Sequence, residues 1–254
     1  MLLTLDRVIV AVDDLEAAAD DYTRLLGVEP APAGPDPDRK VRFQLENTGI
    51  ELVDRKSPAL PAPPAAPGVA ALAFVLDEDE GEREGEGWLE PSSTRGIPIR
   101  LERGGDAAGP AEPRDDADGV TALDHVVIST GDLDAALRLY GERLGLRLAL
   151  DRSFEKRGIR ILFFRIGGIT VEVVGPLAGA RESEGGADAY AGERDRFGGL
   201  AFRVGDVRAT RARLAGQRFD VSEERAGHKP GTRVCTLKSD THGVPTLLIG
   251  PDLW

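Results

Sequence analysis

Cysteine is almost missing from this sequence. Cys235 is the single cysteine in 254 residues, so no internal disulfide can form and a reducing, cytoplasmic location is expected. Long apolar runs are missing too. Asp6 and Arg7 interrupt the short N-terminal run, which argues against a signal peptide, and no run is long enough to span a bilayer.

Positive charge is outnumbered, with 32 Lys and Arg against 44 Asp and Glu. The formal net charge of −12 makes nucleic acid and anionic membranes poor partners, because both need a basic face. A dense acidic run lies in residues 77–90 and is interpreted as a solvated segment. No phosphate-cradling glycine loop and no Ser-His-Asp ordering is found, so no nucleotide cofactor and no serine nucleophile is expected. The 41% hydrophobic share still supports ordinary globular cores.

An internal repeat is present and dominates the interpretation. Residues 5–27 match residues 123–145 without a gap, and each copy has the pattern of a strand, an Asp-capped helix and a glycine stop. The main chemical difference is His125 in the second copy against Arg7 in the first. This indicates a site that was kept in one half and altered in the other.

The repeat continues into later strands. Glu51 and Glu172 occupy matching places, so each copy carries a carboxylate inside a strand. Four modules are counted in all, beginning near Leu3, Val69, Thr121 and Phe197. The second module is predicted to be truncated, without a last strand. Breaker-rich segments at 57–68 and 102–119 are predicted to be exposed connections.

The third module contains a predicted hairpin. Residues 159–166 and 169–174 flank Gly167-Gly168, a dipeptide suited to a tight primed turn. A two-residue turn pairs Phe163 with Glu172, and cross-strand partners share a face. One face is therefore predicted to carry Phe163, Arg165, Thr170 and Glu172, and the face toward the helix to carry Phe164, Ile166, Val171 and Val173.

These motifs together resemble the vicinal oxygen chelate superfamily, which is glyoxalase-, bleomycin resistance protein- and dioxygenase-like. The motifs are the Asp-His-Val-Val-Ile strand, the capped helix ending in Leu-Gly, the Gly-Gly hairpin and the Val-Glu-Val-Val strand. The resemblance implies an α+β fold in which four βαβββ modules pair into two domains with curved mixed sheets. The expected boundaries are 1–105 for the first domain, 106–119 for a linker and 120–254 for the second. Whether the modules pair 1-2 and 3-4 or are swapped stays open.

The resemblance also implies a metal site, which this sequence fills only in part. His125 matches the first-strand histidine and Glu172 the last-strand glutamate, whereas the fourth module has Gly199 and Leu247 at these places. A divalent Zn, Fe, Mn or Ni ion is therefore expected to be weakly bound or absent. Water, substrate, His228 or His242 could complete it.

Alternatives remain open for each candidate residue. His125 and Glu172 are candidates for catalysis, but Glu172 could instead form a structural ion pair with Arg165. The candidate ligand-binding residues are Phe163, Arg165, Arg233, Leu247 and His228. Cys235 is interpreted as a buried apolar residue, because no adjacent base is evident.

Three functions are compatible with these features. The first is an enzyme of lyase, isomerase or dioxygenase type with a degenerate metal site in the C-terminal cup. The second is a metal-independent small-molecule binding protein of the bleomycin-resistance type, and the third is a degenerate scaffold. The expected ligand is largely hydrophobic with a polar or anionic end. The expected assembly is a monomer, as a pseudo-dimer of its two halves, or a homodimer.

Overall fold

The computed structural model describes residues 2–32, 40–76, 86–103, 118–177 and 194–253. Most of the acidic segment 77–90, most of the 106–119 linker and most of the polar segment 181–196 lie outside the described residues. The 57–68 segment is described and consists mainly of turns and bends, as its breaker residues predict.

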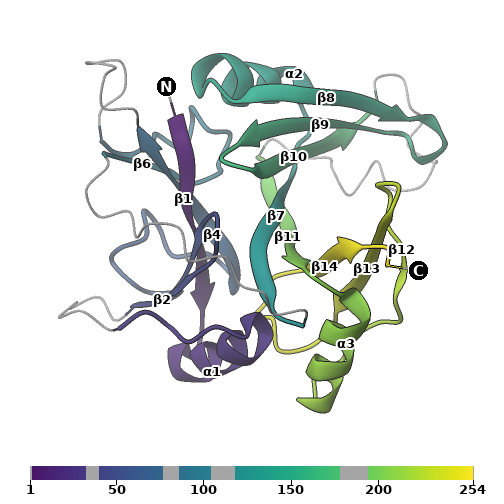
Figure 1. Cartoon of the computed structure of the whole chain (residues 1–254). Helices are drawn as coiled ribbons and strands as arrows, with labels where there is room; N and C mark the ends of the chain where they lie inside the picture. The colour runs from purple at the N-terminus through teal and green to yellow at the C-terminus, as the bar shows by residue number, and fades with distance from the viewer. Residues whose placement is uncertain (1, 33–39, 77–85, 104–117, 178–193, 254) are drawn as a thin grey trace. The chain divides into compact units, whose positions relative to one another are not determined.

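The described residues form an α+β fold, as predicted (Figure 1). The strands are β1 (Leu2–Val12), β2 (Lys40–Gln44), β3 (Gly49–Asp54), β4 (Gly68–Leu76), β5 (Gly87–Trp88), β6 (Ile99–Arg103), β7 (Val120–Ser129), β8 (Arg147–Phe154), β9 (Ile159–Ile166), β10 (Ile169–Pro176), β11 (Arg196–Val204), β12 (Arg225–Ala226), β13 (Thr232–Leu237) and β14 (Thr246–Pro251). The helices are α1 (Leu15–Leu26), α2 (Leu133–Ala136), η1 (Leu137–Arg143), the short turn η2 (Glu155–Arg157) and α3 (Val207–Gly216).

Two mixed sheets contain these strands. The strand order is β2-β3-β1-β4-β6-β5 in one and β12-β13-β14-β11-β7-β10-β9-β8 in the other. In every module the first strand pairs in parallel with a later one: β1 with β3, β4 with β6, β7 with β10 and β11 with β14. The fourfold repeat is therefore confirmed. The expectation that the second module lacks its last strand is wrong, because β6 takes that position.

Aspartate caps begin all three longer helical segments. Asp14 and Asp132 each accept backbone N–H bonds on the side chain, as the sequence predicts, and Asp206 does the same at the start of α3. The helix predicted from Asp132 to Leu144 differs in its second part, because α2 gives way after Ala136 to the π-helical η1. Phe219 lies buried just after α3, outside any strand.

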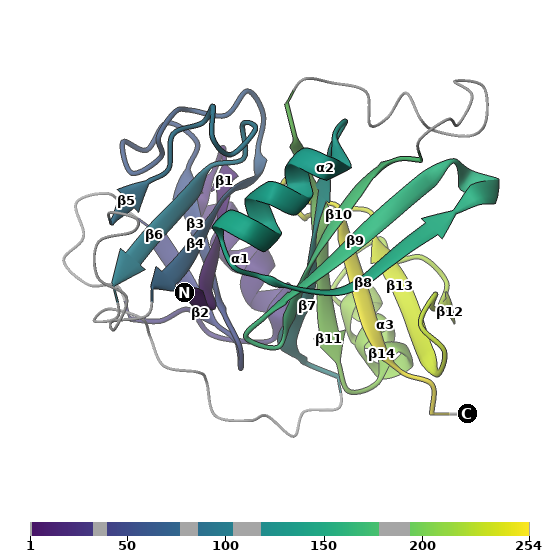
Figure 2. The same ribbon diagram turned by 90° about the horizontal axis from the view of Figure 1, so that it is seen from above.

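The core lies between each helix and its sheet. In the first module Tyr22 of α1 contacts Phe43 of β2 at a ring distance of 6.3 Å. In the third, Tyr140 of η1 contacts Phe164 of β9 at 5.7 Å, and Figure 2 shows this helix lying over the sheet. Burial raises the pKa of both tyrosines.

The chain divides into two compact units, and neither is continuous in sequence. One consists of Met1–Leu5, Leu72–Ala107 and His125–Gly198, and the other of Asp6–Ala71, Ala108–Asp124 and Gly199–Trp254. Each unit thus contains segments of both sequence halves. The boundaries 1–105 and 120–254 stay a prediction. Among the described helices, none is both long and apolar enough to cross a membrane.

Candidate functional site

His125 and Glu172 lie on neighbouring strands. β7 and β10 run parallel, with His125 opposite Thr170 and Val127 opposite Glu172. Since cross-strand partners share a face, both candidate residues lie on one face, called the inner face below. The His125 Nδ1 and Glu172 Oε1 atoms are 3.7 Å apart, and the side chains are 13% and 21% exposed. Thus the two residues are close together and reachable by a ligand.

The hairpin extends this inner face as predicted. β9 and β10 pair Phe163 with Glu172 and Arg165 with Thr170, and both Gly167 and Gly168 have positive φ, as a primed turn requires. Phe164 lies on the opposite face, against Tyr140. The predicted division of the hairpin into two faces is therefore confirmed.

The edge strand β8 adds an apolar side chain that the sequence interpretation missed. Leu150 pairs with Phe163 and is 48% exposed. Val127 lies beside Glu172 on β7 and is partly exposed. Whether these two side chains lie beside the site depends on how their strands pair with the neighbouring strands. The alternation of residues within one strand does not predict that register.

Arg165 does not form the ion pair with Glu172 that was weighed as an alternative. It is exposed, and in the described part of the chain it has no carboxylate partner. Glu172 lies beside His125 instead. An exposed guanidinium at the margin of the inner face leaves Arg165 available to an anionic ligand.

In the first module, the residues at the matching positions form a buried ion pair with each other. β1 and β3 place Arg7 and Glu51 as β7 and β10 place His125 and Glu172, which confirms the predicted equivalence. The Arg7 Nε donates to Glu51 Oε1 at 3.2 Å, and Arg7 Nη1 lies 2.6 Å from Asp6 Oδ2. All three residues are buried. This is a structural ion-pair cluster, and its permanent cation excludes a metal.

The fourth module offers no donor at the matching positions. Register places Leu247 opposite Ala201, so Gly199 and Leu247 occupy the histidine and glutamate positions. Gly199 has φ 139°, and a Cβ there would lie 2.3 Å from the Pro245 carbonyl oxygen. The glycine is therefore required by the backbone.

In the second module the corresponding residues are Ala71 and Arg100. β4 and β6 pair Ala73 with Arg100, which puts Arg100 at the last-strand glutamate position. The Arg100 guanidinium lies 5.6 Å from the Trp88 ring centroid and pairs with Glu102. Of the four modules, only the third keeps both an imidazole and a carboxylate.

The metal implied by the superfamily resemblance does not fit this donor set. Within the described residues, no group of three or more His, Cys, Asp or Glu side chains could hold an ion. His125 and Glu172 supply two donors, whereas protein metal sites of this donor type usually have three or four. No step of the proposed chemistry therefore passes through a metal.

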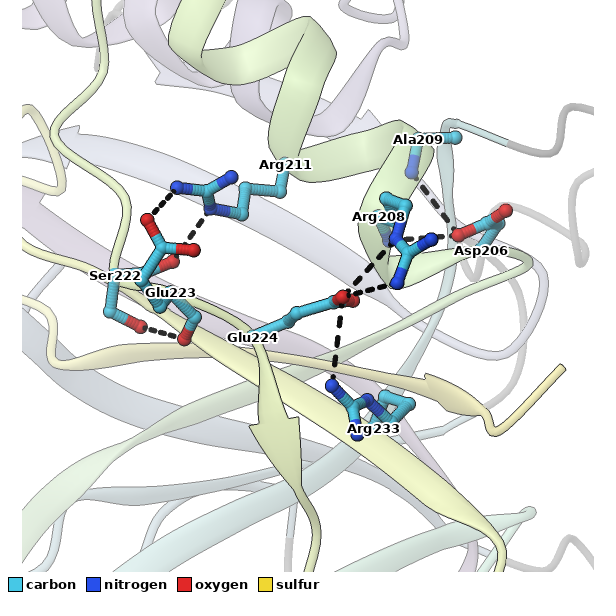
Figure 3. A network of polar contacts seen from close by, with 8 residues as sticks. All are labelled: Asp206, Arg208, Ala209, Arg211, Ser222, Glu223, Glu224 and Arg233. Atoms are coloured by element: carbon cyan, nitrogen blue, oxygen red, sulfur yellow. Dashed lines mark hydrogen bonds and ion pairs between the residues drawn. The ribbon is translucent and has the colours of Figure 1, made fainter. Parts of the chain in front are cut away.

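Arg233 and Leu247 do not share a face. β13 pairs Arg233 with Gly250 and Thr236 with Leu247, so Arg233 lies on the opposite face from Leu247. There the Arg233 Nη2 lies 3.6 Å from Glu224 Oε1, which also accepts from Arg208 of α3 (Figure 3). The expectation that Arg233 points into the same cup as Leu247 is corrected, because it belongs to a polar network on the α3 side.

The two loop histidines have different surroundings. His228 is exposed in a bend after β12. His242 is only 18% exposed, and its Nε2 lies 2.9 Å from Asp21 Oδ2 on α1. His242 therefore links the last module to the first and is occupied by that contact.

Cys235 is buried, as predicted. Burial raises the pKa of its thiol to about 11, so little thiolate exists at neutral pH. We expect a thiol reagent at pH 7.5 to modify the folded protein at least ~100-fold more slowly than the protein in denaturant. Timed labelling followed by mass spectrometry measures both rates, and rapid modification of the folded chain would contradict the buried assignment.

The fold and the duplicated strand positions define a protein built from paired βαβββ modules. Residues 124–236 match one model of the Glyoxalase/Bleomycin resistance protein/Dioxygenase superfamily, and residues 4–81 match another model of the same superfamily. The chain belongs to this superfamily.

Individual relatives are enzymes. The chain is 29% identical over 134 residues to an ethylmalonyl-CoA/methylmalonyl-CoA epimerase of Cereibacter sphaeroides, covering 51% of this chain and 87% of the relative. A methylmalonyl-CoA epimerase structure from Mycobacterium tuberculosis is 27% identical, covering 56% of this chain and 93% of that one with a TM-score of 0.45. A mutant of 4-hydroxymandelate synthase from Streptomyces coelicolor is 17% identical, with a TM-score of 0.68 over 99% of this chain and 93% of that one. The last comparison supports the two-domain fold along nearly the whole chain.

Proposed function

We propose that this protein is an isomerase-type enzyme that removes and returns a proton at a carbon next to a carbonyl group. The observation that carries the proposal is the His125–Glu172 pair, 3.7 Å apart on a partly exposed face. The equivalent residues of the first module are sealed in a buried salt bridge. A retained, reachable imidazole and carboxylate are suited to general acid–base catalysis.

The two side chains have different roles in this proposal. Glu172 lies beside Nδ1 of His125 and favours the tautomer that carries its proton there. Nε2 then accepts the proton from the substrate carbon to leave a planar enolate; returning the proton to the same face gives exchange, and protonation from solvent on the other face gives the isomer. The 3.7 Å separation exceeds a hydrogen bond, and such contacts commonly tighten only when substrate is bound.

The substrate class follows from the surroundings of the pair. Phe163, Val127 and Leu150 make the inner face apolar, and Arg165 offers an exposed cation at its margin. The Cereibacter relative is named for two CoA esters whose acyl groups carry a carboxylate. We therefore propose a carboxylated acyl thioester as substrate, with its carboxylate near Arg165.

Deuterium exchange tests this proposal. Methylmalonyl-CoA and ethylmalonyl-CoA are incubated with the protein in D₂O, and exchange of the proton next to the thioester carbonyl is followed by NMR. We expect faster exchange than in buffer, in the presence of EDTA as well as without it. No acceleration with either ester, with or without added Zn, Mn, Fe or Ni, would contradict the proposal.

Metal-independent binding of a hydrophobic ligand is the second candidate function. The observation that favours it is Leu150, which is 48% exposed on the same face as Phe163. Under this alternative, an aromatic carboxylate binds without turnover. The His125→Asn protein then binds as tightly as the wild type, whereas Phe163→Ala binds more weakly.

A further inference from the structure

A separate cleft lies on the helix side of the third module, away from the inner face. Its volume is about 490 Å³, and it opens between η1 and the turn that contains Ser93 and Arg95. All of its lining residues belong to one compact unit. Three of them are arginines: Arg95, Arg138 and Arg143.

The π-helical geometry of η1 brings two of the arginines together. The Leu144 N–H donates to the Leu139 carbonyl, five residues earlier. In an α-helix, residues five apart point roughly 140° away from each other around the axis. In a π-helix, where the backbone bonds join residues five apart, such residues lie on the same side of the axis instead. Arg138 and Arg143 are therefore presented on the same side of η1, and both line the cleft.

The third arginine is held in place from two directions. The Arg95 Nε donates to Asp195 Oδ1 at 3.0 Å, and that oxygen also accepts from Thr130 Oγ1 at 2.7 Å. The Arg95 carbonyl accepts from the Asp195 N–H at 2.8 Å. Arg95 has φ 54°, a conformation that is costly for a non-glycine residue and persists only where its surroundings fix it. Its guanidinium is thus preorganised at the cleft.

The charges around the cleft limit what it can bind. Asp195 and Asp132, at 3.0 Å and 3.9 Å from Arg95, offset the charge of that arginine. Glu142 lines the cleft as well, and the Arg143 Nη1 donates to the Ser93 carbonyl at 3.4 Å. Arg138 is exposed and has no ion-pair partner among the described residues. The three arginines and the three carboxylates cancel in formal charge, so attraction for an anion depends on the unpaired Arg138, which suits one small anionic group better than a polyanion.

We propose that this cleft binds a small oxyanion, a phosphate or carboxylate group, between Arg138 and Arg143 with Arg95 as a fixed third donor. A guanidinium matches the geometry of both groups because it can donate two parallel hydrogen bonds. The site is distinct from the His125–Glu172 pair and goes beyond the proposed function. It would hold an effector or a remote group of a ligand, not the reacting atoms.

Titration with inorganic phosphate and with acetate at low ionic strength tests this site and separates the two oxyanions. Calorimetry is applied to the wild type, Arg138→Gln, Arg143→Gln and the double variant. We expect saturable binding of at least one anion, weakened roughly tenfold by each single change and lost in the double variant. Added salt should weaken binding too, because the cleft is open to solvent.

Arg157→Gln is the matched control. Arg157 is an exposed arginine of η2 in the same compact unit and outside the cleft, so its variant should bind the anion as the wild type does. Unchanged binding in the double variant, or no binding of either anion by the wild type, would overturn the proposal. The His125→Asn protein should still bind the anion, so failure of this site and failure of the proposed function are separable.

Discussion

His125→Asn is expected to lower the rate of proton exchange by about 10²- to 10⁴-fold, the range that a general acid–base group contributes. Asparagine keeps a polar side chain of similar reach but cannot take up a proton near neutral pH. His125 is partly exposed and its neighbour Glu172 is 21% exposed, so the fold loses little when the imidazole is removed. The measurement is the deuterium exchange rate together with the free energy of unfolding in urea.

The duplicated module supplies a control for the carboxylate. Glu172→Gln should slow exchange while leaving stability nearly unchanged. Glu51→Gln, at the equivalent position of the first module, should leave exchange nearly unchanged. It should lower the free energy of unfolding by about 3 kcal/mol, because it removes a carboxylate from the buried Arg7. Equal effects of the two substitutions on both quantities would show that the third module has no special chemical role.

Much of the fold could be predicted from the internal repeat. The match of residues 5–27 to residues 123–145 fixes the type and order of two strands and two helices. It also predicts that Arg7 and His125 occupy equivalent places, as the β1–β3 and β7–β10 registers show. The Gly167-Gly168 turn fixes the hairpin register, and with it the shared face of Phe163 and Glu172. These features depend on local geometry, which sequence records directly.

The features that could not be predicted depend on contacts between distant segments. The face of Arg233 is set by the pairing of β13 with β14, across a loop whose length does not fix the register. A strand was predicted at 97–102, but it was not recognised as the last strand of the second module, because β6 is joined to β4 through a segment without a recognisable helix pattern. The π-helical turn of η1 lies within a sequence that also fits an α-helix, so the pairing of Arg138 with Arg143 has no sequence signal.

The four modules show how one inherited pair of positions has diverged. The third has His125 and Glu172, the first Arg7 and Glu51, the second Ala71 and Arg100, and the fourth Gly199 and Leu247. Exchanging imidazole for guanidinium converts a titratable group into a permanent cation, which stabilises a buried carboxylate. Exchanging it for glycine allows a backbone conformation that no other residue adopts at low cost. In three of the four modules, the residues at these positions thus no longer form an imidazole–carboxylate pair.

Gly199→Ala is expected to destabilise the protein by about 3 kcal/mol, although it adds only a methyl group. The φ of 139° at Gly199 is strained for any residue with a Cβ, and that atom would lie 2.3 Å from the Pro245 carbonyl oxygen. Pro245 cannot move away freely, because the same oxygen accepts the Leu200 N–H at 2.9 Å. Gly199→His, which restores the residue type of the third module, should fail for the same reason and add no metal affinity.

Gly216→Ala is the matched control for this prediction. Gly216 ends α3, is exposed, and a Cβ there would meet nothing within 4 Å. Alanine should therefore stabilise the helix by roughly 0.5–1 kcal/mol, since it loses less backbone freedom on folding than glycine. Urea unfolding of both variants compares a constrained with an unconstrained glycine in the same compact unit. If Gly199→Ala were as stable as the wild type, the backbone conformation would not explain why the fourth module has glycine where the third has histidine.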